Sequence, residues 1–126
     1  MAYRVLLTDP LGPEGLAHLR QHSELEVVAR TELGPGELRQ AIRGFHALIV
    51  RSRTKVTAEN LAGADVLRVI GRAGIGVDNI DVDAATKRGV VVMNTPGGSN
   101  VTTAEHAIAM LLALARNIPQ ADAAVK

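Results

Sequence analysis

The stretch that decides the fold, residues 67–96, reads LRVIGRAGIGVDNIDVDAATKRGVVVMNTP. Residues 67–70 and 90–93 are short apolar runs rich in β-branched side chains, which are typical of strands. A glycine-rich turn and a helical pattern over 81–88 lie between them. When a helix connects two neighbouring strands, it brings the chain back to the end of the sheet where the first strand began. The two strands therefore run parallel. The stretch therefore predicts one strand–helix–strand unit of an α/β fold.

The same alternation extends toward the N-terminus. We predict further strands over 3–8, 26–29 and 47–50, and helices over 14–22, over 57–62 and after the turn 34–36. The strand 47–50 has no polar residue, which favours a strand covered on both faces. Thr57, with Asn60 three residues later, predicts the start of a short helix. Five strands alternating with helices predict a parallel sheet flanked by helices.

A different pattern begins after residue 98. Thr102 and Glu105 form a capping-box pattern, which predicts that a helix starts at Thr102 and runs to residue 118, before Pro119. Every residue from 107 to 115 is apolar, and a helix that is apolar all round must be covered on every side. We therefore expect this helix to pack against another domain or another subunit, and we divide the chain into residues 1–98 and 99–126.

The composition excludes several classes of function. The 126 residues carry 14 Lys and Arg against 13 Asp and Glu, so charge alone attracts neither nucleic acid nor membrane. One Phe, one Tyr and no Trp leave almost nothing on which bases could stack. The chain has no cysteine, and its longest apolar run is far shorter than the roughly 20 residues of a membrane span. We expect a cytoplasmic protein that binds neither nucleic acid nor membrane.

Candidate ligand-binding residues follow the predicted strands. Ligands of open parallel sheets bind beyond the carboxyl ends of the strands. The residues expected there are Arg51, Arg53, Arg72, the turn Gly74-Ile75-Gly76, and Asn94. Glycines with positive φ can direct backbone N–H groups into an anion-binding concavity, and a guanidinium matches a carboxylate or phosphate. We predict a site for a small, multiply anionic molecule; the alternative is that the arginines are solvated surface charges.

This glycine turn is not a dinucleotide fingerprint. The position of the third glycine is taken by Asn79, and Asp78 would place a carboxylate beside a pyrophosphate. The next strand ends at Asn94, so no acid is available for a ribose. His18 and His22 are spaced like metal ligands but lack a third, and no histidine is paired with a carboxylate as a general base would be. We therefore predict substrate binding, with no metal site and no catalytic residue in this chain.

Residues 69–96, together with 50–57 and 104–116, resemble the D-isomer-specific 2-hydroxyacid dehydrogenases. The resemblance spans the whole chain and is strongest to the members that oxidise 3-phosphoglycerate to 3-phosphohydroxypyruvate in serine biosynthesis. It implies a flavodoxin-like substrate domain and a long apolar helix that opens a Rossmann NAD-binding domain. It also implies a homo-oligomer formed through helix 102–118, with NAD as cofactor.

The resemblance assigns roles to individual residues. Arg51 and Arg53 would help hold the substrate phosphate, and Arg72 would line the anionic pocket. The backbone of Gly74, Ile75 and Gly76 would bind the substrate carboxylate, Ile75 would also touch the nicotinamide, Asn94 would lie at the domain crossover, and Thr103 would lie at the cofactor edge of the long helix.

The resemblance also implies what this chain lacks. The family's dinucleotide fingerprint, ribose acid, catalytic arginine and Glu–His pair all follow the position of residue 126. We therefore expect the 126-residue chain to be catalytically incomplete by itself. Two alternatives remain open: the same portion of a glyoxylate or hydroxypyruvate reductase, and a free-standing module for anion binding or dimerisation.

Overall fold

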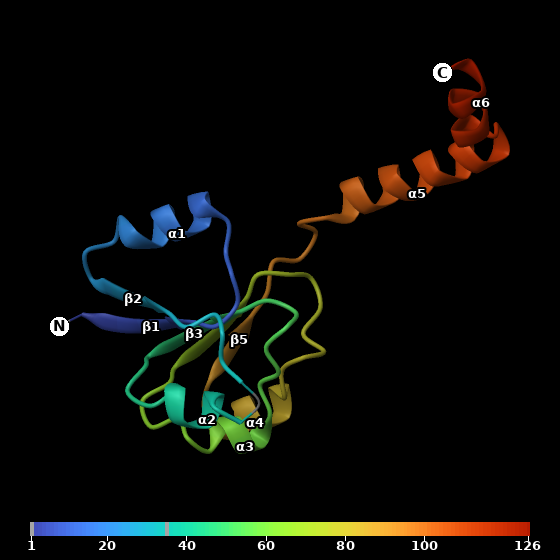
Figure 1. The fold of residues 1–126 in the computed structure, drawn as a ribbon. Coiled ribbons are helices and arrows are strands. Elements are labelled where there is room, and N and C mark those ends of the chain that lie inside the picture. Colours follow the sequence, from blue (N-terminus) through green and yellow to red (C-terminus); the bar gives the residue numbers. More distant parts are fainter. Residues whose placement is uncertain (1, 35) are drawn as a thin grey trace. The chain divides into compact units, whose positions relative to one another are not determined.

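The computed structural model describes residues 2–34 and 36–126, and its first unit is built on a five-stranded parallel sheet (Figure 1). The strands are β1 (Tyr3–Leu7), β2 (Leu25–Ala29), β3 (Ala47–Val50), β4 (Val69–Arg72) and β5 (Val91–Met93). Their order across the sheet is β2-β1-β3-β4-β5, and all neighbours are parallel. The predicted α/β class and the parallel sheet are confirmed.

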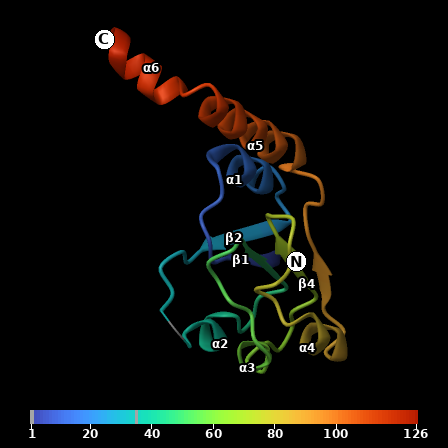
Figure 2. The same cartoon turned by 90° about the vertical axis from the view of Figure 1, so that its right-hand side faces the viewer.

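Helices flank the sheet on both faces. They are α1 (Pro13–Arg20), α2 (Leu38–Ala41), α3 (Ala58–Leu61) and α4 (Val82–Lys87). Figures 1 and 2 show α1 on one face and α2, α3 and α4 on the other. The chain winds from β1 to β2 in one direction and from β3 to β5 in the other, so the winding reverses between β1 and β3. That reversal opens a crevice at the carboxyl ends of these two strands.

The main core lies between the sheet and α2–α4. Leu6, Leu48 and Ile70 form a fully buried row across β1, β3 and β4, because the strand register places them side by side. They pack with Leu38, Ile42 and Phe45 from the α2 region, and with Leu61 and Ala85 from α3 and α4. The period of two along each strand therefore directs every second apolar side chain toward these helices.

Several expected boundaries are corrected. In β3, Leu48 and Val50 are buried but Ala47 and Ile49 are only half-buried, so the expected full cover on both faces is wrong. The reason is that α1, on the other face, contacts β2 and buries none of its own residues. β4 starts at Val69 and extends through Arg72, so Gly71 and Arg72 belong to the strand and not to the turn. Of the turn expected at 34–36, Pro35 lies outside the described residues.

The Thr57 cap is confirmed. The Thr57 hydroxyl oxygen accepts the N–H of Asn60 at 3.3 Å at the start of α3. At the start of α4, the Asp81 carboxylate accepts the N–H of Ala84 at 2.9 Å in the same way. These short polar caps satisfy N–H groups that a helix start leaves without partners.

The chain divides into two compact units, Met1–Pro96 and Gly97–Lys126. The second unit contains α5 (Asn100–Ala115) and α6 (Ile118–Val125). The expected single helix with an N-cap at Thr102 is therefore wrong at both ends. Ser99 is the N-cap residue, and the Thr102 hydroxyl donates to the Ser99 carbonyl at 3.1 Å. Asn117 takes a left-handed φ of 51°, which asparagine tolerates, and Pro119 fits the first turn of α6.

The apolar side chains of α5 are exposed within this unit. Ile108, Met110, Leu111, Leu112 and Leu114 are all more exposed than buried, and α5 has no buried residue. Among the described residues, no helix is both long and apolar enough to span a membrane.

Candidate functional site

Asp9 occupies the crevice where the winding of the sheet reverses. It follows β1, is 1% exposed, and faces the loop that leaves β3. Its Oδ2 accepts the N–H of Arg51 at 2.7 Å and the N–H of Thr54 at 3.1 Å. Its Oδ1 accepts the Thr54 hydroxyl at 2.7 Å. One carboxylate therefore holds the whole turn 51–54.

Asp9 is ionised in the folded protein. Burial of the carboxyl opposes ionisation, but four favourable interactions outweigh it and lower the pKa of Asp9 below its ordinary value. They come from the Thr54 hydroxyl, the backbone N–H groups of Arg51 and Thr54, and the charge of Arg53. At neutral pH a negative charge therefore lies beneath a loop that carries two arginines.

The two arginines of this loop have different surroundings. The Arg51 guanidinium is exposed and donates to the Pro10 carbonyl at 3.3 Å. The Arg53 guanidinium lies with its Nε 3.4 Å from Asp9 Oδ1, and its Nη2 donates to the Thr8 and Thr31 carbonyls. Arg53 is thus engaged by three groups that follow β1 and β2, whereas the Arg51 guanidinium has one hydrogen-bond partner among the described residues, the Pro10 carbonyl after β1.

Arg72 ends β4 and turns back over its own loop. Its side chain is 10% exposed, its Nε donates to the Arg51 carbonyl at 3.4 Å, and its Nη1 donates to the Gly76 carbonyl. Its Nη2 lies 3.7 Å from the exposed Asp78 carboxylate. Arg72 therefore connects the loop after β3 with the glycine turn after β4.

The glycine turn does not use the left-handed backbone conformation that glycine permits. A Gly-x-Gly turn allows positive φ, but neither Gly74 nor Gly76 adopts it. A Cβ at Gly76 would lie 3.1 Å from Arg72 Nη1, so the glycine allows a close approach of the guanidinium. In the described part of the chain, the N–H groups of Ile75 and Gly76 donate no hydrogen bond. They remain available to an anion beside Arg72.

Asn94 binds the glycine turn, and Asn79, which follows the turn, binds the loop after β3. Asn94 Nδ2 donates to the Ile75 carbonyl at 2.6 Å, and the Thr95 N–H donates to the Gly74 carbonyl at 2.9 Å. Asn79 Nδ2 donates to the carbonyls of Arg51 and Thr54, both at 2.7 Å. The N–H groups of Ile75 and Gly76 thus belong to a turn whose backbone is held by hydrogen bonds from Asn94 and Thr95.

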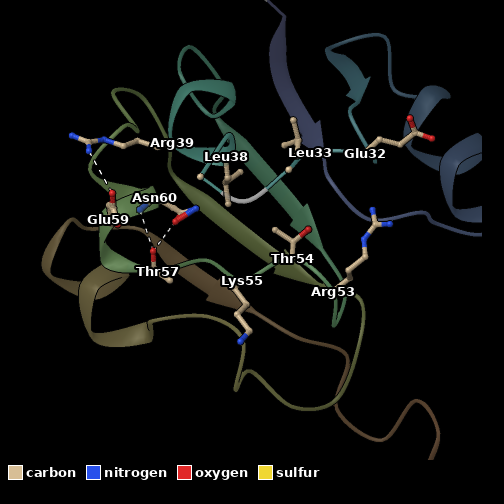
Figure 3. Close-up of a pocket in the computed structure, with 12 residues that line it drawn as sticks. Glu32, Leu33, Leu38, Arg39, Arg53, Thr54, Lys55, Thr57, Glu59 and Asn60 are labelled. Atoms are coloured by element: carbon tan, nitrogen blue, oxygen red, sulfur yellow. Dashed lines mark hydrogen bonds and ion pairs between the residues drawn. The ribbon is translucent and has the colours of Figure 1, made fainter.

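A pocket with a mixed polar and apolar lining adjoins this edge on the α2 and α3 side. Arg53, Thr54 and Lys55 line one part of it, and Figure 3 shows Leu33 and Leu38 nearby. The Arg39 guanidinium lies 3.8 Å from the Glu59 carboxylate, and Arg53 is paired with Asp9. Glu32 and Glu59 also line the pocket, so two carboxylates would lie close to an anion bound there.

Most of the predicted site residues belong to one connected set. Arg51, Arg72, the turn 74–76 and Asn94 lie at the carboxyl ends of β3, β4 and β5. Thr103 belongs to the second unit. Sequence reasoning missed the structural roles of Asp9, Thr54 and Asn79. A polar residue directly after a buried strand was the available signal for Asp9, but its partners are 42 and 45 positions away.

The sequence model of the D-isomer specific 2-hydroxyacid dehydrogenase catalytic domain matches residues 5–123. The chain belongs to this family. The chain is 50% identical over 123 residues to a D-3-phosphoglycerate dehydrogenase of Archaeoglobus fulgidus and 47% identical to that of Methanocaldococcus jannaschii. Each match covers 98% of this chain but 23% of the relative. The chain thus spans less than a quarter of the length of these curated relatives.

Two solved structures have a similar fold. The TT0316 protein from Thermus thermophilus is 36% identical, with a TM-score of 0.81 over 95% of this chain and 39% of that structure. A 3-phosphoglycerate dehydrogenase from Entamoeba histolytica with bound NAD+ is 28% identical, with a TM-score of 0.77 over 90% of this chain and 39% of that structure. The family resemblance of the sequence is confirmed.

Proposed function

We propose that the chain is the substrate-binding portion of an NAD-dependent D-3-phosphoglycerate dehydrogenase, which oxidises 3-phosphoglycerate to 3-phosphohydroxypyruvate for serine biosynthesis. One observation carries the proposal. The N–H groups of Ile75 and Gly76 are without hydrogen-bond partners in the described structure, and they belong to the turn that the Arg72 guanidinium contacts. Two donors and a permanent cation at the carboxyl edge of a parallel sheet fit a carboxylate.

The substrate would span two parts of this edge. Its carboxylate would be held by Ile75, Gly76 and Arg72, and its phosphate would be held by the exposed Arg51. Arg53 would attract the phosphate by its charge more than by direct contact, because its guanidinium already binds Asp9 and two carbonyls. Relatives named D-3-phosphoglycerate dehydrogenase, at 44–50% identity, favour a phosphorylated acid over the substrates of glyoxylate or hydroxypyruvate reductases.

NAD would accept the hydride from the hydroxyl-bearing carbon of the substrate. The residues of this chain fit one edge of such a cofactor. Ile75 is 42% exposed on a turn fixed by Asn94, so its apolar side chain can contact a nicotinamide ring. The turn 74–79 does not fit a pyrophosphate, because Asn79 is committed to the loop after β3. Thr103 would meet the cofactor from α5.

The second unit would begin the NAD-binding Rossmann domain. Its exposed apolar side chains on α5 support a role in packing against that domain and in contacts between subunits of a homo-oligomer. The cytoplasmic location expected from the sequence stays a prediction.

Calorimetric titration of the 126-residue chain with 3-phosphoglycerate tests the proposal. We expect saturable binding that is weaker for glycerate, because glycerate lacks the phosphate. Arg72→Ala should weaken binding by on the order of 1.5–3 kcal/mol, which is roughly tenfold to a hundredfold. Arg88→Ala is the matched control, because Arg88 also donates to a backbone carbonyl, that of Ala64, away from the site. Equal affinities for glycerate and 3-phosphoglycerate would favour the reductase alternative.

A further inference from the structure

We propose that Asp9 and Asn79 are positioning residues that clamp the loop 51–54 from opposite sides, so that Arg51 and the glycine turn form one preorganised anion site. This inference rests on the proposed function. Neither side chain is expected to touch the substrate. Both act through the backbone that carries Arg51.

The two side chains bind complementary groups of the same two residues. Asp9 accepts the N–H groups of Arg51 and Thr54, at 2.7 and 3.1 Å. Asn79 donates to the carbonyls of Arg51 and Thr54, both at 2.7 Å. The amide orientation of Asn79 is determined by these partners, because only its nitrogen can donate to two carbonyl oxygens. The loop is therefore fixed at both of its ends by one acceptor and one donor.

The chemistry of each residue suits its half of the clamp. A carboxylate can accept the three hydrogen bonds that reach Asp9, and hydrogen bonds to an ionised group are stronger than neutral ones. An asparagine amide supplies two N–H donors. Asp9→Asn removes the negative charge, and its N–H₂ group must face either the two backbone N–H groups or the Arg53 guanidinium. Asn79→Asp would direct an oxygen toward two carbonyls. Each substitution preserves shape and weakens the hydrogen bonds that hold the loop.

Other attachments of the loop are the contacts of the Arg51 and Arg53 guanidiniums with residues that follow β1 and β2. Arg51, Ser52 and Arg53 are exposed, so this segment gains little from apolar burial. Next to it, the Val56 N–H donates to the Asn79 carbonyl and the Asp81 N–H donates to the Val56 carbonyl, each at 2.8 Å. The loops after β3 and β4 thus run side by side, and Arg72 adds its contact to the Arg51 carbonyl. Asn79 therefore sets the distance between Arg51 and the glycine turn.

Such a clamp matters for binding because a loop that must become ordered on binding loses affinity. A phosphorylated hydroxy acid has its two charged groups at opposite ends, so Arg51 and the glycine turn must be held at a defined separation. Supporting residues that hold such groups typically change affinity or activity by about tenfold to a hundredfold when they are removed.

The experiment uses the 126-residue chain with Asp9→Asn, Asn79→Asp and a matched control, Asp65→Asn. Asp65 is a suitable control because it also accepts a backbone N–H, from Gly44 at 2.8 Å, in the loop before β3. Hydrogen exchange of the Arg51 and Thr54 amides and the affinity for 3-phosphoglycerate are measured for every variant under conditions in which it is fully folded. We expect faster exchange at these two amides in Asp9→Asn, and affinity lower by about tenfold or more in Asp9→Asn and Asn79→Asp. Asp65→Asn should match the unsubstituted chain in both measurements.

Thr54 provides a second test if Asp9→Asn does not fold. Thr54→Val removes the hydroxyl that donates to Asp9 Oδ1, whereas Thr54→Ser keeps it. We expect Thr54→Val to weaken binding and Thr54→Ser to restore it, and a difference in general stability alone would not produce this affinity pattern. The proposal would be overturned if Asp9→Asn and Asn79→Asp bound 3-phosphoglycerate as tightly as Asp65→Asn does. The same result for Thr54→Val would also overturn it.

The two proposals fail in different ways. If the unsubstituted chain does not bind 3-phosphoglycerate, the proposed function is wrong. Amide exchange alone then tests whether Asp9 and Asn79 hold the loop 51–54. Unchanged exchange at Arg51 and Thr54 in Asp9→Asn would refute it. If the unsubstituted chain binds and the clamp variants bind equally well, the proposed function stands and the positioning role is wrong.

Discussion

The Arg72 guanidinium donates through its Nε to the backbone carbonyl of Arg51, at 3.4 Å. Arg72 ends β4, and Arg51 directly follows the neighbouring parallel strand β3, whose last residue Val50 is paired with Arg72. The side chain of one arginine therefore helps to place the backbone that carries the other. Binding of a ligand between the two would act on a single connected structure, and substitutions at Arg72 should affect more than its own charge.

Arg72→Lys is expected to lower affinity for 3-phosphoglycerate by about tenfold although the positive charge is retained. A lysine ammonium is a compact charge without the planar fork, so it cannot contact Arg51, Gly76 and an anion together as a guanidinium can. Calorimetric titration measures the affinity, and thermal unfolding measured in parallel separates binding from stability. Full affinity in Arg72→Lys would mean that the Arg72 contacts with the two carbonyls are irrelevant to the site.

Stability should depend on pH through Asp9. The pKa of Asp9 is lowered in the folded state, so its ionised form stabilises the fold above the ordinary pKa of an aspartate, about 3.9. This contribution is lost as the pH falls through the lower folded-state pKa. As the pH falls from about 5 through that lowered pKa, the unsubstituted chain should therefore lose more unfolding free energy than Asp9→Asn. Urea unfolding at a series of pH values measures it, and two parallel curves would contradict the assignment.

Two glycine substitutions should change stability in opposite directions. Gly15 lies inside α1, and a Cβ added there would meet no other atom within 4 Å, so Gly15→Ala should raise the unfolding free energy by about 0.5–1 kcal/mol. Gly63 follows α3, and a Cβ there would overlap the Arg39 carbonyl, so Gly63→Ala should be destabilising. Urea unfolding compares the two variants directly. An increase in stability for Gly63→Ala would show that the approach of α2 to this position is not tight.

The exposed apolar face of α5 should make the chain self-associate. Leu111 and Leu114 are 66% and 77% exposed, and water contact with such side chains is unfavourable. In sedimentation velocity we expect species larger than the 13.3 kDa chain, and the double variant Leu111→Glu/Leu114→Glu should shift the population to monomer. Val66→Glu is the control, because Val66 is an exposed apolar residue of the first unit. A monomeric unsubstituted chain would contradict the predicted oligomer contact through helix 102–118.

The fold class follows from features that are local in the sequence. The apolar β-branched runs predicted the bounds of β3 without error and the bounds of the other four strands to within two residues. Such side chains pack well on the pleated surface of a sheet, so the runs favour strands. The predicted bounds of an element were wrong where a contact between residues distant in sequence, or the conformation of a single residue, sets its end. β4 continues through Arg72 because β3 lies beside it as a pairing partner, and the long helix breaks at Asn117 because that residue adopts a left-handed conformation.

The anion site was predictable by position but not by contact. The arginines and the glycine turn follow strands, so their place at the carboxyl edge can be inferred from the alternation alone. The pairing of Arg53 with Asp9 could not be inferred, because it depends on which strand lies beside β3. The strand order makes β1 that neighbour, and this places a buried carboxylate beneath the arginine loop.

By itself, the sequence determined the parallel α/β fold, the family, and the arginines and glycines available for an anion. Periodicity and residue type carry that information because secondary structure and ligand chemistry depend on local side chains. Only the tertiary structure decided that Asp9 and Asn79 hold the loop of Arg51, and that Arg53 faces Asp9. Hydrogen bonds act over about 3 Å, so residues distant in sequence interact only after the strands have paired in order.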